Sequence, residues 1–333
     1  MVKLMKILVL GGSGFIGVNI ARHLLAGGYA VRILHRPNRP PRYLTDLDPE
    51  LVVGDLNDRD SLLAAIAGCS HLVHAAGYYP IYANRPTRQL ELAKRQMANV
   101  LTAVRQSGVE RLIYISSLAT LGRPQSPEEL VDEETPYRPQ DFPATYHRIK
   151  YEMEQQVLQV VQQSLPTTIL IPTAVIGAFD HKPTTGRVVL ELLKGKLPVY
   201  LNGRLNVVAV RDLAATVEKV LHSDRAAGRY ILGNWNTTLK DFLGMVAQIG
   251  SVRAPWLRMP WSIAYPAAKA SEWFGTHLSH QIKPLLPVTG LDLLRYGHHV
   301  NIGKARRELD FIPSPVSIAI KEAIAWFKQE GYL

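Results

Sequence analysis

The segment KILVLGGSGFIG, residues 6–17, decides the fold. Its apolar first half predicts a buried strand over Lys6–Leu10, which runs directly into a loop with glycines at three-residue intervals. In this spacing one glycine permits a tight turn, one lets the backbone approach a pyrophosphate, and one lets the next helix pack on the strand. The first turn of that helix offers N–H groups and a partial positive charge to phosphates. We therefore predict a dinucleotide-binding loop whose cofactor-binding residues are Gly11, Gly14, Phe15, Ile16 and Gly17.

Two other kinds of glycine-rich loop do not fit this spacing. A nucleoside-triphosphatase phosphate loop ends in Gly-Lys-Ser/Thr, whereas this loop continues Phe15-Ile16-Gly17. A nucleophile elbow needs a glycine two residues after its serine, and Phe15 stands two residues after Ser13. Both classes of site are excluded here.

Short apolar runs alternate with helical patterns through the first half of the chain. Strands are predicted at Lys6–Leu10, Ala30–Leu34, Leu51–Val53, His71–His74, Arg111–Ser116 and Thr167–Ile171, and helices near Gly14–Ala26, Ser61–Ala67, Thr87–Ser107 and Thr145–Ser164. Apolar strands separated by helices are typical of a parallel sheet that is covered on both faces. The predicted fold class is therefore α/β, a doubly wound parallel (Rossmann) sheet with a smaller, mainly helical C-terminal substrate lobe.

Beyond Ile171 prolines and glycines break this alternation. A strand at Val207–Val210 and a helix from Asp212 predict a return to the sheet, and a last amphipathic helix is predicted over Val316–Glu330. The expected division is residues 1–173 as the dinucleotide-binding domain, to which 207–232 return, residues 174–206 and 233–315 as the substrate lobe, and 316–333 as a C-terminal helix. The substrate is expected between sheet and lobe, outside the carboxyl ends of the strands.

Composition excludes several classes of protein. The 333 residues are 47% hydrophobic and 20% charged, which is typical of a globular chain. The single cysteine, Cys69, excludes a disulfide framework and any Cys-rich metal site, and the isolated pair His298-His299 predicts no metal site either. No stretch reads as a signal peptide or approaches the length of a membrane span, so a cytoplasmic protein is expected. The net charge of +10 favours anionic small molecules over nucleic acid, because no basic run with interleaved aromatics occurs.

The residues after the second predicted strand bear on the choice of cofactor. An NAD enzyme usually places an acid there for the ribose hydroxyls, whereas this chain has Arg36 and no carboxylate before Asp46. Arginine suits a 2′-phosphate, so NADP is favoured over NAD, the alternative being that Arg36 is an ordinary solvated residue. Asp55, after the third strand, is predicted to accept a hydrogen bond from the adenine amino group, unless it serves only as a helix N-terminal acid.

Tyr146 and Lys150 form the second informative motif. Their i, i+4 spacing puts both on one face of a helix, where a lysine ammonium would favour the phenolate and lower the tyrosine pKa. Such a tyrosine is a usable acid and base for an alcohol–ketone pair. The alternative is a surface helix, but the glycine loop and Ser116-Ser117 at the end of strand five favour a catalytic site.

With these motifs the chain resembles an extended short-chain dehydrogenase/reductase of the NAD-dependent epimerase/dehydratase family. Further matching stretches are Gly54-Asp55-Leu56, His74-Ala75-Ala76-Gly77, Asn99-Val100, Pro172 to Gly177, Asn206 to Ala214 and Lys304-Ala305-Arg306. Within the family, residues 180–186 and 229–233 resemble hopanoid-associated sugar epimerases, which neighbour dihydroflavonol-reductase-like enzymes.

The resemblance implies roles for individual residues. Ser117 would bind the reacting oxygen, Tyr146 would exchange its proton, and Lys150 would hold the nicotinamide ribose. It also implies cofactor contacts for Leu56, Ala75, Ala76, Gly77, Asn99, Ser116, Pro172, Thr173, Ala174 and Val175, and a homodimer through the helices near 87–107 and 145–164.

The substrate is less well indicated. Nucleotide-sugar epimerases often carry arginines at positions that are Leu205 and Ile171 here, which weakens a nucleotide-diphosphate sugar as substrate. Arg187 is a candidate anion contact, and Tyr78 and Tyr79 could stack on a sugar or another ring.

Three functions remain open. The favoured one is a sugar (nucleoside-diphosphate-sugar) epimerase-like enzyme, which would keep its cofactor bound through a closed redox cycle. The second is an NADPH-dependent ketone reductase of the dihydroflavonol-reductase type. A non-catalytic dinucleotide sensor is the third, and it has no need of Ser117, Tyr146 and Lys150.

Overall fold

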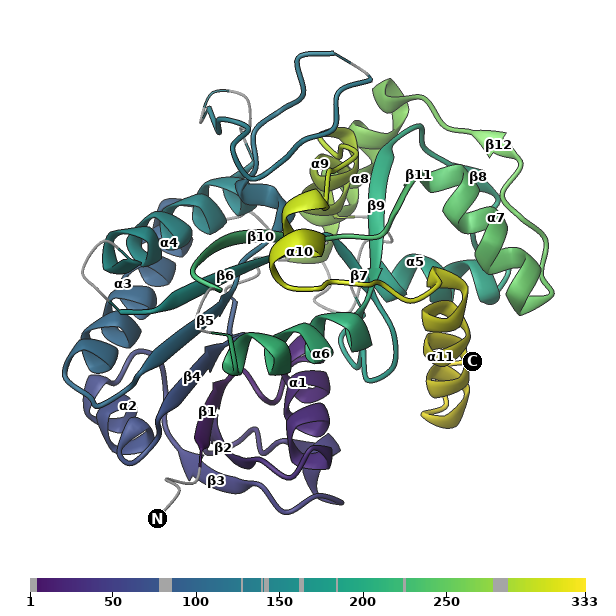
Figure 1. Ribbon diagram of the computed structural model, residues 1–333. Coiled ribbons are helices and arrows are strands. Elements are labelled where there is room, and N and C mark those ends of the chain that lie inside the picture. Colours follow the sequence, from purple (N-terminus) through teal and green to yellow (C-terminus); the bar gives the residue numbers. More distant parts are fainter. Residues whose placement is uncertain are drawn as a thin grey trace.

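The computed structural model describes residues 5–77, 86–126, 128–138, 140, 144–161, 165–183, 185–223, 226–277 and 287–333 (Figure 1). Its larger part is a seven-stranded parallel sheet in the order β10-β6-β5-β4-β1-β2-β3. The strands are β1 (Lys6–Leu10), β2 (Ala30–His35), β3 (Glu50–Val53), β4 (His71–His74), β5 (Arg111–Ile115), β6 (Thr167–Pro172) and β10 (Gly228–Leu232). The predicted doubly wound α/β fold is confirmed.

Helices cover both faces of this sheet. On one side lie α2 (Arg59–Ile66), α3 (Pro86–Arg105) and α4 (Thr145–Val161), and on the other α1 (Phe15–Ala26) and α6 (Val210–Leu221) (Figure 1). The strands are apolar and buried, as the central β1 shows with Ile7 to Leu10 inaccessible to solvent. Two-sided burial of this kind explains why the strands appear in the sequence as continuous apolar runs rather than as alternating patterns.

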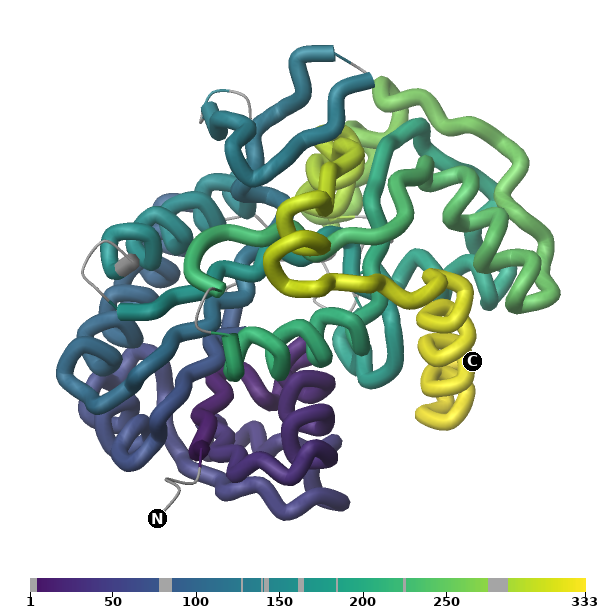
Figure 2. Tube along the Cα trace, in the orientation of Figure 1, coloured from purple at the N-terminus to yellow at the C-terminus, as the bar shows by residue number. Residues whose placement is uncertain are grey.

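The smaller lobe has its own apolar core. It contains a three-stranded sheet, β11-β9-β7, and a two-stranded one, β12-β8. Its elements are β7 (Ala174–Ile176), α5 (Thr185–Leu193), β8 (Val199–Tyr200), β9 (Arg204–Ala209), β11 (Trp235–Thr238), α7 (Leu239–Gly250), β12 (Leu257–Arg258), α8 (Trp261–His277), α9 (Val288–Arg295) and α11 (Val316–Gln329), while α10 (Gly303–Glu308) lies against β10. Figure 2 shows how the chain crosses between the two parts several times.

The strand expected to return to the main sheet does not do so. β9 pairs with β7 and antiparallel with β11 in the lobe, so that prediction was wrong. The strand that does return is β10, which lies parallel to β6 at the edge of the large sheet. Both segments are short and apolar, and such a pattern predicts a buried strand without specifying which partner it pairs with.

A buried amide joins the lobe to the end of β6. The Asn206 side chain on β9 accepts hydrogen bonds from Thr173 Oγ1 at 2.8 Å and from the Asn234 backbone N–H at 2.9 Å. It donates to Asn236 Oδ1 at 2.8 Å. Because Asn206 is only 1% exposed, satisfying its polar atoms fixes the lobe against the carboxyl edge of the sheet.

Within the described ranges, no helix is both long and apolar enough to cross a membrane.

The glycine loop yields a stability prediction. A Cβ at Gly17 would lie 2.0 Å from the Gly11 carbonyl oxygen, so Gly17→Ala forces the start of α1 away from β1. We expect a loss of about 3 kcal/mol or more in the free energy of unfolding, at the upper end of overpacking costs, measured by urea denaturation.

Gly244 supplies the matched control. It lies in α7 with nothing within 4 Å of an added Cβ, so Gly244→Ala should stabilise the protein by about 0.5–1 kcal/mol. Similar effects of the two substitutions would contradict the proposed close contact.

Candidate active site

Close backbone approaches bring two loops together at the carboxyl edge of the sheet. Gly11 has a φ of +87°, and a Cβ there would lie 2.6 Å from the Ala76 backbone nitrogen. The Gly14 N–H donates to the Gly11 carbonyl at 2.8 Å, and the Ala75 N–H donates to the Leu10 carbonyl at 2.9 Å. The predicted glycine loop and the loop after β4 therefore form one cradle of side-chain-poor backbone, which fits the pyrophosphate and ribose of a dinucleotide.

Asp55, Leu56 and Asn99 meet beside this cradle. The Asn99 side chain on α3 donates to the Leu56 carbonyl at 2.9 Å, so it fixes the loop after β3. One Asp55 carboxylate oxygen accepts hydrogen bonds from the Asn57 backbone and side chain at 2.8 and 2.6 Å. These contacts hold the half-buried Asp55 in place, and its role toward adenine stays a prediction.

Ser117, Tyr146 and Lys150 converge next to the cradle. Tyr146 Oη donates to Ser117 Oγ at 3.1 Å, and Ser117 begins the short 3-10 helix Leu118–Thr120. A Cβ at Gly77 would lie 2.7 Å from Lys150 Nζ, so the lysine ammonium reaches the loop after β4. The structure thus brings the three predicted catalytic side chains and the predicted cofactor loop to one place.

Burial dominates the protonation of this group. It raises the pKa of Tyr146 to about 12, although the hydrogen bond to Ser117 opposes the rise. It lowers the pKa of Lys150 to about 8, which the nearby Glu154 carboxylate opposes. The sequence predicted a lowered tyrosine pKa, and the structure has the opposite direction because the loss of solvation on burial outweighs the hydrogen bond to Ser117. Tyr146 is therefore a neutral phenol at neutral pH and able to donate a proton.

Glu154 is a residue that the motif analysis missed. It lies one turn beyond Lys150, only 1% exposed, and accepts hydrogen bonds from the Ser116 hydroxyl and from Arg229 Nε, the latter at 2.9 Å. The Arg229 guanidinium on β10 also donates to the Glu133 carbonyl. The sequence spacing could have indicated Glu154, because Tyr146, Lys150 and Glu154 follow one another at intervals of four residues and so share one helix face. The Ser116 hydroxyl thus contacts Glu154, and its predicted cofactor contact stays a prediction.

Pro172 to Val175 lead from the sheet into the lobe. Pro172 ends β6, Thr173 binds Asn206, and Ala174 and Val175 begin β7. Their place at the carboxyl end of β6 is the edge where ligands bind in open α/β sheets.

A positive cluster forms at the end of β2. Arg36 and Arg39 are exposed in a turn closed by a 2.9 Å hydrogen bond from the Arg39 N–H to the Arg36 carbonyl. Burial, and then the positive charges of Arg39 and Arg36, lower the pKa of Lys182, so this lysine approaches the same turn from the loop after β7. The first acid of the segment, Asp46, forms a two-pronged ion pair with Arg22, with both N–O distances at 2.7 Å. The Asp46 carboxylate is therefore already paired with a side chain of α1.

Several contacts hold the segment that carries Lys182. Asn19 on α1 donates to the Ala178 carbonyl at 3.0 Å, and the His181 ring lies 5.3 Å from the Tyr43 ring. Phe179, with a positive φ of 68°, packs under the Arg22 guanidinium at 4.8 Å. The sequence analysis missed Lys182, because nothing local to residues 180–186 indicates its proximity to Arg36.

The remaining predicted residues contribute less to the site. Tyr78 and Tyr79 lie outside the described residues. Arg187 is half-buried on α5, and its contact with substrate stays a prediction. His298 and His299 bond to the carbonyls of Tyr296 and Thr237 at 2.9 and 3.0 Å. Within the described part of the chain, no three metal-ligating side chains converge.

Comparisons with known proteins agree with this geometry. The profile of the NAD dependent epimerase/dehydratase family matches residues 7–233. A putative dihydroflavonol 4-reductase of Synechocystis sp. is 32% identical, with 98% of this chain and 95% of the relative covered. Sterol demethylase protein B of Methylococcus capsulatus is 26% identical over 99% of this chain and 100% of the relative. The solved structure of a nucleoside-diphosphate-sugar epimerase from Pseudomonas aeruginosa superposes with a TM-score of 0.81 at 25% identity, with 99% of both chains covered.

The buried lysine yields a pH prediction. Its pKa of about 8 lies below the ordinary value of 10.5, so the unfolded chain binds more protons between those values and stability rises with pH in that window. We expect the difference in the free energy of unfolding between the wild type and Lys150→Met to rise by about 3 kcal/mol from pH 8 to 10.5. Taking this difference cancels the buried tyrosines, such as Tyr146, whose raised pKa acts in the opposite direction near pH 10. Urea titrations across this range measure it.

The exposed Lys321 on α11 serves as the control, and Lys321→Met should keep the wild-type profile. Parallel profiles for Lys150→Met and the wild type would contradict the depressed lysine pKa.

Proposed function

Because the chain belongs to the NAD-dependent epimerase/dehydratase family, we propose that it is an NADP(H)-dependent reductase that converts a ketone into a secondary alcohol. Membership of the family confirms the resemblance inferred from the motifs, and the chain is an NAD(P)-dependent enzyme. The observation that carries the choice of cofactor is the cluster of Arg36, Arg39 and Lys182. Three cations suit a 2′-phosphate, and Asp46, the first acid after β2 in the sequence, is paired with Arg22.

The cradle fits a dinucleotide, because side chains at Gly11, Gly17 or Gly77 would fill it or collide with its walls. When bound in this cradle, NADPH would supply the hydride for the reduction and leave as NADP⁺. Ser117 would hold the carbonyl oxygen of the substrate, and Tyr146 would give that oxygen its phenolic proton as the carbonyl carbon gains the hydride. The Lys150 ammonium, behind Tyr146 and beside Gly77, would stabilise the phenolate left behind until it regains a proton from solvent.

Two observations favour reduction over the epimerisation that the motifs first suggested. The cations at Arg36, Arg39 and Lys182 suit NADP(H), the cofactor that a reductase consumes and releases. A relative with 32% identity over nearly the whole chain is named as a reductase. Epimerisation of a nucleoside-diphosphate sugar remains the second candidate, supported by the similarity to the Pseudomonas aeruginosa epimerase.

The cofactor assignment is tested by binding. Arg36→Ala and Lys182→Ala should each weaken NADPH binding by about tenfold or more, the loss of one charge-assisted contact, and leave NADH binding unchanged because NADH lacks the 2′-phosphate. Fluorescence titration of the reduced nicotinamide measures both constants.

Arg306→Ala removes an exposed arginine on α10 and should change neither constant. Equal weakening of NADPH and NADH binding in the Arg36 and Lys182 variants would refute a 2′-phosphate site.

The reaction class is tested by the dinucleotide content of the purified protein. A reductase releases its oxidised cofactor, so denaturation should liberate well below one dinucleotide per chain, and added NADPH should be oxidised by a ketone substrate. Tyr146→Phe should abolish that oxidation while keeping the affinity for NADPH. Near-stoichiometric NAD(P) released from the wild type would instead support the epimerase.

A further inference from the structure

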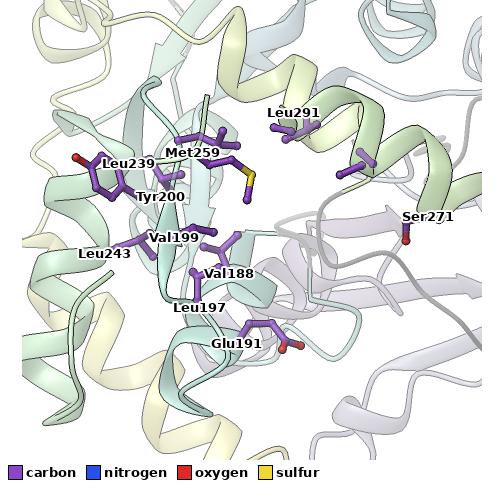
Figure 3. Close-up of a pocket in the computed structure, with 14 residues that line it drawn as sticks. Val188, Glu191, Leu197, Val199, Tyr200, Leu239, Leu243, Met259, Ser271 and Leu291 are labelled. Carbon is purple, nitrogen blue, oxygen red and sulfur yellow. The ribbon is translucent and has the colours of Figure 1, made fainter. Parts of the chain in front are cut away.

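The lobe contains an apolar cavity that the reaction chemistry does not use. It lies between α5, β8, α7, α8 and α9 and has a volume of about 200 Å³ (Figure 3). Its walls include Leu197, Leu239, Leu243, Met259 and Leu291. Figure 3 shows the Tyr200 hydroxyl turned away from Met259, so the wall presents mainly hydrocarbon.

The residues that line this cavity favour an apolar ligand over a phosphorylated one. None of the fourteen described residues that line it is Lys, Arg or His, and the single charged one is the acidic Glu191. A diphosphate would be repelled there and would lose its hydration without compensation. A pocket lined mainly by apolar side chains suits the hydrocarbon part of a ligand.

Helix α9 connects the cavity to the reaction centre. Leu291 on α9 lines the cavity, and Tyr296, directly after α9, has its ring 6.1 Å from that of His147, the neighbour of Tyr146 on α4. Five residues of helix span about 7.5 Å. One end of α9 therefore lines the cavity, and the residue after its other end contacts the helix that carries Tyr146 and Lys150.

We propose that this cavity binds the hydrocarbon chain of a substrate whose carbonyl group is reduced at Ser117 and Tyr146. The inference rests on the proposed reductase function and deepens it, because it names an aliphatic ketone rather than a sugar nucleotide as the substrate class. Selectivity among ketones then comes from burial of methylene groups in the lobe, while Tyr146 on α4 supplies the proton and the carboxyl edge of the sheet holds the cofactor.

Straight-chain 2-alkanones from 2-pentanone to 2-nonanone are the probes. Their binding to the NADP⁺-loaded full-length protein is measured by titration calorimetry, and their reduction by loss of NADPH absorbance. Each added methylene should tighten binding by about fourfold until the cavity is filled. Uridine diphosphate, the competing ligand class, should not displace the longer alkanones.

Two alanines on α8 provide a matched pair of variants. Ala267 is exposed and lines the cavity, whereas Ala270 is exposed on the same helix and does not line it. Ala267→Trp should abolish the gain with chain length, and Ala270→Trp should retain it. Because both positions accept a large side chain at the surface, both variants are expected to fold.

The outcomes separate the two proposals. A gain with chain length in the wild type that only Ala267→Trp removes supports the cavity as the hydrocarbon site. No gain with chain length, an equal gain in both variants, or displacement by uridine diphosphate overturns it. Binding that depends on chain length, without any oxidation of NADPH, supports the cavity as the hydrocarbon site and contradicts the reductase function. Oxidation of NADPH that does not depend on chain length supports the reductase function and contradicts the hydrocarbon site.

Discussion

The structure depends on three glycines that permit close contacts where the loops after β1 and β4 meet. Gly17 lets α1 start against the Gly11 carbonyl, Gly11 lets the first loop touch the backbone at Ala76, and Gly77 leaves room for Lys150. A methyl group at any of these points would collide with a neighbour. The cradle for the cofactor and the position of the catalytic lysine are therefore consequences of one packing constraint at the carboxyl edge of β1 and β4.

The same packing buries the amino group of Lys150, and a carboxylate on the same helix, α4, stabilises its charge. Lys150 is 6% exposed, and the Glu154 carboxylate one turn further along the helix stabilises its charged form. Glu154 is itself held by the Ser116 hydroxyl and by Arg229 from β10. Breaking a buried pair of this kind leaves an uncompensated charge, which costs more than the pair contributes. The edge strand β10 thus supports the predicted reaction centre through the contact of Arg229 with Glu154.

Local sequence patterns predicted those features that are set by residues close together along the chain. The glycine loop, the i, i+4 pair Tyr146 and Lys150, and the parallel sheet all follow from spacing and periodicity. The partner of β9, the direction of the Tyr146 pKa and the approach of Lys182 to Arg36 depend on segments that meet only in three dimensions. Burial decided the tyrosine pKa, and a motif read along one helix carries no information about burial.

The segment between β7 and α5 explains how cofactor and substrate are arranged on one scaffold. Lys182 approaches the Arg36 turn, whereas Val188, in the second turn of the helix that follows, lines the apolar cavity. Asn19 and Tyr43 anchor the first part of this segment to the dinucleotide-binding side, and packing of α5 on α7 anchors the second part in the lobe. The proposed 2′-phosphate site and the proposed hydrocarbon site therefore share this short stretch of chain. A change in its backbone is expected to alter both sites together.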